Sequence, residues 1–389
     1  VRAGDSAALA RGQGASAWRR RTYSAAQLLS YLGLLLPAGP LLAFVMISER
    51  GLEGGAWGQW TTSLGHAGWL LLVAGIYLAW LLLDLLLTTT VPRWVSHWLK
   101  PGMDYPLYGL HYALLRGIQA WSNSRIFNAM FGDSSAIVHY LRAVGWRFPG
   151  LVQLGSNLGM AQQHDVPTLN TIGSGTMVSD GLSMLNADYG AQVFRVHEQG
   201  LGRNCYLGNM IFLPPRHRVG DNCLLGTKVM VPLDGPLREN TGLLGSPAME
   251  IPRSVQRDTD SALALQPPDM ALALRAKNRA NALSMLGYVV ANGLPTILLA
   301  WIWAEFEPEM QAHGALWHAG FLSLVVLLFL TWFLVVDGAS RGWTRLQPLM
   351  CSIYDAAFWR HERHWKLGLA QDNPLMAMLD GTPMKAMVW

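Results

Sequence analysis

The chain has 389 residues, of which 51% are hydrophobic and only 14% are charged, whereas an ordinary soluble domain has about 25% charged residues. This composition excludes a protein whose whole surface faces water and favours a membrane protein with lipid as a partner. The formal net charge of +4 is small, and the basic residues lie beside apolar runs, so we expect no nucleic-acid partner. The three cysteines have no CxxC spacing, so neither a disulfide framework nor a metal site is predicted.

Four apolar runs are long enough to cross a bilayer core, which takes roughly 20 helical residues. They cover residues 24–48, 66–90, 281–303 and 315–336. They predict two transmembrane hairpins, 24–90 and 281–337, with a segment 1–23 before the first. The first run is too long for the apolar core of a signal peptide, so we expect no cleavable leader. Asp84 lies inside the second run, and packing between helices or near headgroups is favoured over a functional role.

Basic residues flank the runs on one side, and acidic residues fill the short hairpin tips. The basic flanks contain Arg19, Arg20, Arg21, Arg93, Lys100, Arg275, Lys277 and Arg279. The tips contain Glu49, Arg50 and Glu53 in the first hairpin and Glu305, Glu307 and Glu309 in the second. The positive-inside rule therefore predicts that the segment between the hairpins is cytoplasmic.

Between Leu154 and Leu243 an aliphatic residue recurs at every sixth position. The aliphatic positions are Leu201, Leu207, Leu213, Val219, Leu225, Val231, Leu237 and Leu243, and upstream Leu154, Met160, Val166, Ile172, Val178 and Met184. Gly or Pro often follows directly, as in Gly202 and Gly220. Such a fixed period is typical of a parallel β-helix, in which three short strands close one coil of about 18 residues.

The expected fold class is therefore membrane α-helical hairpins plus an all-β left-handed parallel β-helix of about five coils. The β-helix covers 149–256, after an amphipathic helical linker 91–148 and before a linker 257–280. A run of unrelated short strands with Gly-rich turns is the alternative. The period breaks once, because Met184 and Leu201 are 17 residues apart, and we expect a polar loop extruded there. Loops on a rigid repeat are common positions for functional residues.

Several motifs of the chain occur together in a known family. They are Gly173-Ser-Gly-Thr-Met-Val, Gly220-Asp-Asn-Cys-Leu-Leu-Gly-Thr-Lys, Glu250-Ile-Pro-Arg-Ser-Val, Phe131-Gly-Asp-Ser-Ser and Tyr354-Asp-Ala-Ala-Phe-Trp. With them, nearly the whole chain resembles the membrane-embedded C-terminal region of nonribosomal peptide synthetases of the ε-poly-lysine synthetase type. The resemblance implies tandem hexapeptide-repeat acyltransferase-like modules in a bacterial plasma membrane, downstream of adenylation and carrier domains.

An internal repeat independently favours tandem modules. Pro106-Leu107 and Tyr112 recur as Pro348-Leu349 and Tyr354, each 242 residues later. Residues 338–389 are therefore expected to form a linker and the start of a second, truncated module. Neighbouring β-helix modules would then associate as a pseudo-trimer, as the resemblance implies. Chance similarity between apolar, Trp-rich segments is the alternative.

The activity implied by the resemblance is amide-bond formation between a carrier-bound aminoacyl thioester and a free amino acid. The acyl donor is the phosphopantetheine thioester of the carrier domain, and this region binds no cofactor of its own. Such a reaction needs a base and groups that hold the substrate. The catalytic candidates are His164, His197 and Asp188, and the substrate-binding candidates are Asn186, Tyr189 and Glu198.

Other assignments remain open from the sequence. His217 lies on an inward-type position, which favours a structural histidine. The sister modules of the family have a histidine where this chain has 185–188, so this module could be degenerate. A non-catalytic membrane scaffold is therefore the alternative function. A stand-alone enzyme using acetyl-coenzyme A is less attractive, because the chain lacks a basic cluster for phosphates.

Overall fold

The computed structural model describes residues 17–35, 56–149, 158, 162–252 and 269–368. The chain divides into two compact units. Unit 1 contains Val1–Leu41 and Ala79–Asp260, and unit 2 contains Leu42–Leu78 and Ser261–Trp389. Each unit is described by itself.

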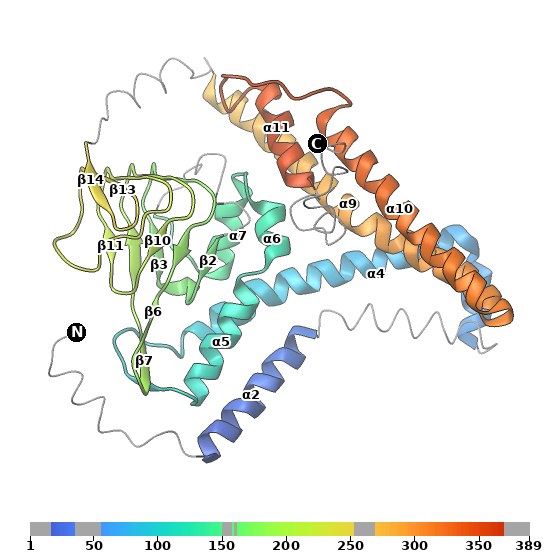
Figure 1. Ribbon diagram of the computed structural model, residues 1–389, viewed down its shortest axis with the longest axis horizontal. Helices are drawn as coiled ribbons and strands as arrows, with labels where there is room; N and C mark the ends of the chain where they lie inside the picture. The colour runs from blue at the N-terminus through green and yellow to red at the C-terminus, as the bar shows by residue number, and fades with distance from the viewer. Residues whose placement is uncertain (1–16, 36–55, 150–157, 159–161, 253–268, 369–389) are drawn as a thin grey trace. The chain divides into compact units, whose positions relative to one another are not determined.

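Unit 1 contains a stack of successive turns built from short strands, called here the coil. The strands of neighbouring turns pair with one another and form three sheets (Figure 1). Its strands are β2 (Gln163–His164), β3 (Asn170–Ile172), β4 (Met177–Val178), β5 (Ser183–Met184), β8 (Gln199–Leu201), β9 (Tyr206–Leu207), β10 (Phe212–Leu213), β11 (Arg218–Val219), β12 (Leu224–Leu225), β13 (Gly242–Leu244) and β14 (Met249–Ile251). The sheet orders are β10-β5-β2, β11-β8-β3 and β14-β13-β12-β9-β4. All pairs within them are parallel except β13 with β14.

The register shows the predicted stacking of six-residue units. Leu224 and Leu225 pair with Tyr206 and Leu207, 18 residues earlier. The aliphatic residues at sixth positions point inward and are almost fully buried, as seen for Leu201, Leu207, Leu213, Val219, Leu225, Val231 and Leu243. The period therefore arises because one side chain per strand fills the interior of the coil. The left hand of the coil stays a prediction.

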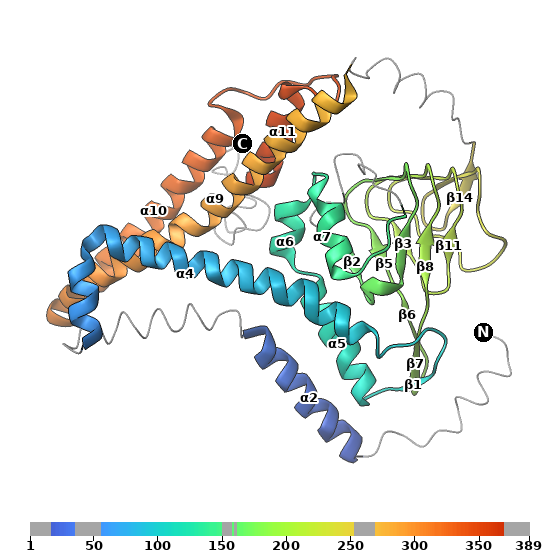
Figure 2. The same cartoon turned by 180° about the vertical axis from the view of Figure 1, so that it is seen from behind.

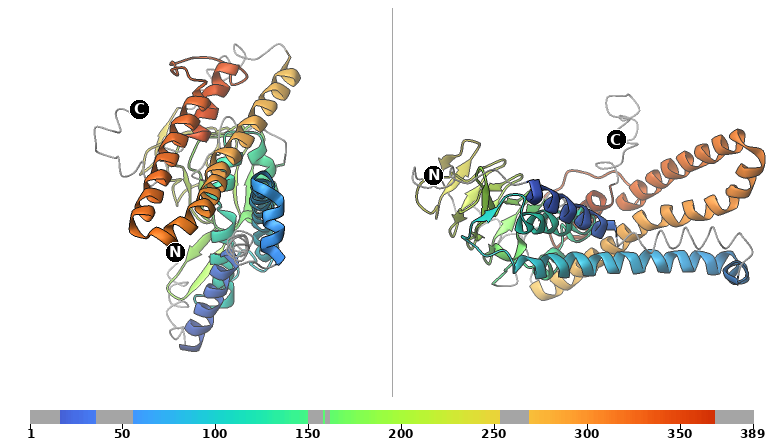
Figure 3. Two further views of the ribbon diagram at one scale, coloured as in Figure 1. Left: turned by 90° about the vertical axis from the view of Figure 1, so that its right-hand side faces the viewer. Right: turned by 90° about the horizontal axis from the view of Figure 1, so that it is seen from below.

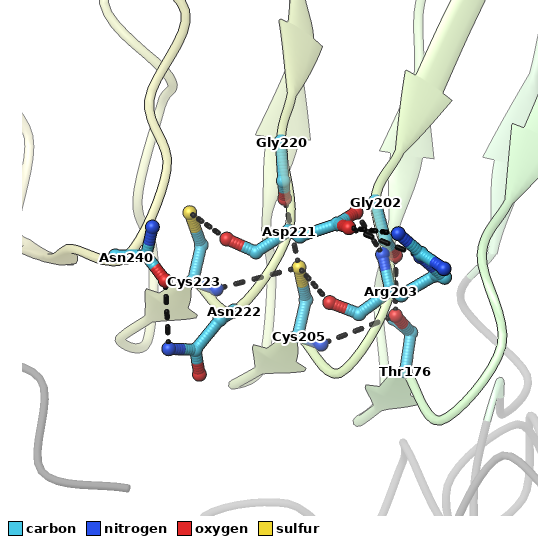
Figure 4. Close-up of polar contacts among 9 residues, drawn as sticks. All are labelled: Thr176, Gly202, Arg203, Cys205, Gly220, Asp221, Asn222, Cys223 and Asn240. Atoms are coloured by element: carbon cyan, nitrogen blue, oxygen red, sulfur yellow. Dashed lines mark hydrogen bonds and ion pairs between the residues drawn. The ribbon is translucent and has the colours of Figure 1, made fainter.

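The corners of the coil follow the same period. A residue with positive φ recurs at Asn204, Met210, Arg216, Asn222 and Lys228, and Asn is among the residues that tolerate this left-handed conformation best. Asn222 Nδ2 donates to Asn240 Oδ1 at 3.0 Å across successive coils (Figure 4). Gly202 is required at its position, because a Cβ there would lie 2.3 Å from the carbonyl carbon of Gly220.

Two parts of the predicted register are wrong. Leu237 is 54% exposed, because Val219 bridges Arg238 instead and a turn with Gly235 at φ 98° adds a residue. Upstream, Met184 stacks on His164, so Val166 does not occupy the expected corner. The short 3-10 helix η2 (Pro167–Leu169) takes up the additional length there.

The predicted extrusion between Met184 and Leu201 is a β-hairpin (Figure 2). It consists of β6 (Ala187–Tyr189) and β7 (Val193–Val196), which pair antiparallel. The outer edge of β7 pairs with β1 (Tyr105–Pro106) from the preceding linker. Phe194 is completely buried in a cluster with Tyr105, Leu115 and Ile118, so the hairpin is fixed to the helices beside it.

The helices of unit 1 precede the coil. They are α2 (Ala17–Leu35), the end of α4 (Ala56–Ser96), α5 (Leu110–Ser122), α6 (Arg125–Phe131) and α7 (Ala136–Val144). Helix α5 buries Leu115, Ile118 and Ser122, a spacing of three and four residues that places them on one face. This face packs against the hairpin and the first coil, and so positions the polar residues described below.

Unit 2 contains α9 (Met270–His313), α10 (Ala315–Arg341) and α11 (Ala356–Leu367). Helices α9 and α10 run side by side as a hairpin (Figure 3). The hairpin turns at Gly314, whose φ of 71° suits glycine. The expected tip 304–314 is almost entirely helical, because α9 continues past Trp303 to His313.

Three described helices are long and apolar enough to cross a membrane: Ala67–Ser96, Ala271–Glu307 and Ala315–Arg341. They contain three of the four predicted runs. For the first run, 24–48, residues 36–48 lie outside the described part of the chain. Asp84 is half-buried and hydrogen-bonds Thr88 one turn later.

Candidate functional site

The residues predicted to be functional lie on or beside the extruded hairpin, in two layers. A buried layer joins the base of the hairpin to α5 and the first coil. An exposed layer, called here the hairpin cluster, contains Asp188, His197, Glu198, Arg147, Arg216 and Arg218. The two layers differ in what their side chains can do.

His164 belongs to the buried layer, where only 2% of the residue is exposed. Its Nε2 lies 2.9 Å from Ser122 Oγ, and Ser122 Oγ donates to the carbonyl of Ile118 at 2.7 Å. The Ser122 hydroxyl donates its hydrogen to Ile118, so it can only accept from His164. The imidazole therefore carries its hydrogen on Nε2, and Nδ1 has a lone pair and no hydrogen. Burial lowers the pKa of His164 to about 3, so the ring is neutral. A substrate does not reach this side chain in the described conformation.

The same layer fixes α5 to the first coil. Asn123 Nδ2 donates to the carbonyl of His164 at 2.8 Å, and Asn123 Oδ1 accepts from His164 N at 2.9 Å. Asp165 accepts from Ala187 N at 2.9 Å and from Gln119 Nε2 at 2.6 Å. Burial raises the pKa of Asp165, and these hydrogen bonds act against that rise.

Asn186 also lies in the buried layer and is fully buried. Its Oδ1 accepts from Val166 N at 3.1 Å, and its Nδ2 donates to Asn170 Oδ1 at 2.8 Å and to the carbonyl of His197 at 3.0 Å. The amide thus satisfies backbone groups at the base of the hairpin. Its hydrogen-bonding capacity is used by the protein, and we do not assign it to substrate binding.

The hairpin cluster brings His197 and Asp188 together through Arg216. Arg216 Nε donates to His197 Nε2 at 3.1 Å, and Arg216 Nη2 lies 2.8 Å from Asp188 Oδ2. His197 is half-buried, and burial, followed by the Arg216 charge, lowers the pKa of this imidazole. His197 is therefore neutral near pH 7, with its proton on Nδ1 and its Nε2 lone pair directed at Arg216.

Glu198 and Tyr189 lie at the edges of this cluster. Glu198 is paired with Arg218 at 2.9 Å and lies 3.6 Å from Arg147. Tyr189 is 48% exposed, and its ring centroid is 6.4 Å from that of Tyr112. Burial of part of the ring raises the pKa of Tyr189 to about 12, so the hydroxyl keeps its proton and can donate.

The structure thus joins two of the three catalytic candidates and separates His164 from them. Sequence reasoning missed Arg216, which lies 18 residues after Glu198, one coil later. Residues 18 positions apart stack in successive coils, and this spacing was the signal that would have placed Arg216 next to Glu198. His217 hydrogen-bonds the carbonyls of Pro215 and Leu233, as a structural histidine does.

The chemistry available in the hairpin cluster is acid–base chemistry and ion pairing. Within the part of the chain that the structure describes, no three His, Cys, Asp or Glu side chains form a group able to hold a metal ion. Cys205 and Cys223 are buried in the coil interior (Figure 4). The exposed carboxylates can hold a cation, and the neutral imidazole can accept a proton.

Comparison with family models and with curated proteins gives no match. A solved maltose O-acetyltransferase from Clostridium difficile 630 is similar over 36% of this chain and 88% of its own, at 15% identity and a TM-score of 0.27. A mutant of AntD, an N-acyltransferase from Bacillus cereus, is similar over 33% of this chain and 94% of its own, at 11% identity and a TM-score of 0.20. Both solved structures are of acyl-group transferases, at a similarity too low to support an argument about this chain.

Proposed function

We propose that the chain is an acyltransferase-like module of a membrane-bound peptide synthetase. In this proposal the module forms amide bonds between a thioester-bound aminoacyl group and the amine of a free amino acid. The observation behind it is the position of the His197 imidazole, half-buried on an extruded hairpin with the exposed carboxylates of Asp188 and Glu198 in the same cluster. The likeness of the motifs to the ε-poly-lysine synthetase type supplies the reaction class.

His197 is the base of the proposed reaction. The side chains of Arg216 and Asp188 are 49% and 41% exposed, so an incoming ammonium group can replace the guanidinium between Asp188 and His197. Asp188 and Glu198 then hold the positive charge, and the Tyr189 hydroxyl is available as a further donor. This exchange costs little, because exposed ion pairs contribute only about 0–1 kcal/mol.

The chemical step is a single acyl transfer. The bound ammonium group first releases one proton to water. The resulting free-base amine attacks the thioester carbonyl, and the C–N bond forms as a second proton passes from nitrogen to His197 Nε2. The C–S bond then breaks, and the protonated imidazole returns that proton to the leaving sulfur. The products are an amide and a thiol, and no oxidant or reductant is needed. A positioned base of this kind contributes about 10²- to 10⁴-fold in rate.

The wider setting follows from the same resemblance and is part of the proposal. The coil is a left-handed β-helix on the cytoplasmic side of a bacterial plasma membrane. The thioester is that of a carrier-domain phosphopantetheine, loaded by an adenylation domain of the same synthetase. Neighbouring β-helix modules complete a pseudo-trimer.

The test is amide formation by the reconstituted full-length synthetase, with a carrier loaded with an amino acid. His197→Ala is expected to lower single-turnover amide formation by at least about 100-fold, with folding checked by far-ultraviolet circular dichroism. His217→Ala is the matched control, because its imidazole binds carbonyls outside the hairpin cluster, and it is expected to stay within a few-fold. A His197→Ala rate within a few-fold of wild type would contradict the proposal.

A non-catalytic scaffold is the second candidate function. It is favoured by one observation: in the described conformation Arg216 occupies the lone pair of His197, and both carboxylates already have arginine partners. The imidazole and both carboxylates of this surface therefore already have partners when no substrate is bound. In that case His197→Ala leaves amide formation unchanged, whereas removing the whole chain from the synthetase abolishes membrane association of the neighbouring modules.

A further inference from the structure

The second hairpin has one end where basic and aromatic residues gather. Because α9 and α10 turn at Gly314, the start of α9 and the end of α10 lie at the same end of the hairpin. The middle of α10 exposes apolar side chains such as Leu322 at 62%, Leu327 at 61% and Leu334 at 56%. A surface of this kind is suited to hydrocarbon, so the basic end lies where a bilayer core would end.

Helix α11 is fixed at that end. Lys277 Nζ lies 3.0 and 3.1 Å from the two carboxylate oxygens of Glu362, and both side chains are buried. One turn of α10 is held as well, because Ser340 Oγ lies 2.9 Å from His364 Nδ1. Leu367 packs with Ala291 and Val336. Helix α11 is thus the third helix of a rigid group at the boundary of the apolar surface.

Four arginines remain exposed around this group, and we call them the basic rim: Arg275, Arg279, Arg345 and Arg360. Two nearby acids are paired with basic side chains, Asp337 with Arg341 and Glu362 with Lys277. Asp355 Oδ2 accepts from Ser352 N at 3.1 Å and Asp269 Oδ1 accepts from Leu272 N at 3.0 Å, so both of these exposed carboxylates keep their negative charge. The four exposed arginines outnumber these two carboxylates, and the surface at this end therefore has a net positive charge.

Aromatic and apolar side chains are exposed in α11 and in the segment that joins α10 to α11. Trp343 is 73% exposed, Met350 94% and Trp365 57%. Such side chains favour the level of the headgroups and the first methylene groups of a bilayer, where a ring can be half wet. Guanidinium groups bind phosphate oxygens in a bidentate manner. A phospholipid offers both chemistries in one molecule, with a phosphate above its acyl chains.

We propose that the basic rim, together with Trp343, Met350 and Trp365, is a binding site for anionic phospholipid. The arginines contact the phosphodiester and the negative headgroup, and the exposed tryptophans and Met350 contact the upper acyl chain. The site is independent of the acyl-transfer proposal, because it uses residues of unit 2 alone. Its occupant is a lipid and not a soluble anion, because large apolar side chains are exposed at the same end as the arginines.

The test uses the full chain purified in detergent and titrated with phosphatidylglycerol, with bound lipids counted by native mass spectrometry. The paired change Arg345→Gln and Arg360→Gln is expected to weaken retention of phosphatidylglycerol by roughly fivefold for each arginine, and to leave retention of phosphatidylcholine unchanged. The pair Arg125→Gln and Lys228→Gln removes the same charge from exposed positions of unit 1 and is expected to have no effect.

Three outcomes would overturn the proposal. One is equal retention of the two lipids by the wild-type chain. Another is equal loss in the rim and control variants, which would mean a net-charge effect. The third is displacement of phosphatidylglycerol by inorganic phosphate at millimolar concentration, which would mean a soluble-anion site. The Trp343→Ala variant tests the contact with the acyl chain. Because both lipids have acyl chains, this variant is expected to weaken retention of both.

Discussion

His164 and His197 are both close to the extruded hairpin, but the chain gives them opposite environments. His164 is enclosed by the first coil and α5, and its ring completes a chain of hydrogen bonds through Ser122. His197 is half-buried and faces Arg216, whose side chain is 49% exposed. Only the second arrangement combines a proton acceptor with access for a substrate.

The rate of amide formation should depend on pH through His197. The free-base fraction of the amine substrate itself falls with pH, so each rate is divided by that fraction. Because burial and the Arg216 charge lower the pKa of this imidazole, the normalised wild-type rate is expected to stay flat from pH 8 down to the ordinary imidazole pKa of about 6.5 and to fall at lower pH. Arg216→Ala removes the nearby cation and leaves Asp188, so the fall should begin at higher pH. Single-turnover rates between pH 5 and 8.5 measure this.

Arg218→Ala is the matched control for that shift, because Arg218 pairs with Glu198 and not with the imidazole. Its profile should follow the wild type. An unchanged profile in Arg216→Ala would contradict the assignment of His197 as the titrating base.

The stability of unit 1 should depend on pH through His164. Its pKa is lowered to about 3 in the folded chain, whereas the unfolded value is about 6.5. Between these values the unfolded chain binds a proton that the folded chain does not, so the free energy of unfolding falls as pH falls. The expected loss is about 1.4 kcal/mol per pH unit, and none is expected above pH 6.5.

Denaturant unfolding in detergent, followed by tryptophan fluorescence at pH 7.5 and 5.5, measures that loss. His164→Leu cannot be protonated and should show a smaller loss between the two pH values, although its stability at pH 7.5 is lower. The same loss in both proteins would mean that His164 is protonated in the folded state or exposed.

The hairpin of β6 and β7 depends on Phe194, which is fully buried against rings of β1 and α5. Phe194→Ala should cost about 3–5 kcal/mol, and most of it should appear as local opening of the hairpin. Hydrogen exchange at 187–196 is expected to rise while exchange in β9 and β12 does not. Phe212→Ala, 43% exposed on the coil surface, is the control, and equal effects of the two would refute a separately fixed hairpin.

Much of the coil could be predicted from its period, because each strand must place one aliphatic side chain inward. The prediction failed where backbone turns changed the count. At Leu237 an added residue turns the side chain outward, and before Ile172 the η2 turn shifts His164 onto Met184. Neither turn changes the spacing of hydrophobic residues enough to be recognised in a single sequence.

The candidate site was only partly predictable. A break in the period located the hairpin and hence Asp188 and His197. Their partner Arg216 comes from the next coil. The partner of His164 is Ser122 in α5, 42 residues earlier in the chain. Contacts of this kind depend on how elements stack and pack, and the local pattern of residues does not encode them.

The whole chain combines apolar helices with a polar hairpin extruded from the coil. Three described helices are long and apolar enough to cross a bilayer. Asp188 and His197 lie at the hairpin, which is held in place by α5 and β1. The proposed synthetase works only if an acyl donor attached to a flexible arm reaches that face.

The most direct test is affinity labelling with a pantetheine arm that ends in a thiol-reactive bromoacetyl group. A cysteine is introduced by Asp188→Cys on the hairpin, or by Lys228→Cys at an exposed corner of the coil, each with Cys351→Ser. We predict that the probe alkylates the protein with Asp188→Cys at least tenfold faster, and that aminoacyl-pantetheine slows only that reaction. Equal rates at the two positions, without protection by the donor, would contradict the proposed acyl-transfer site.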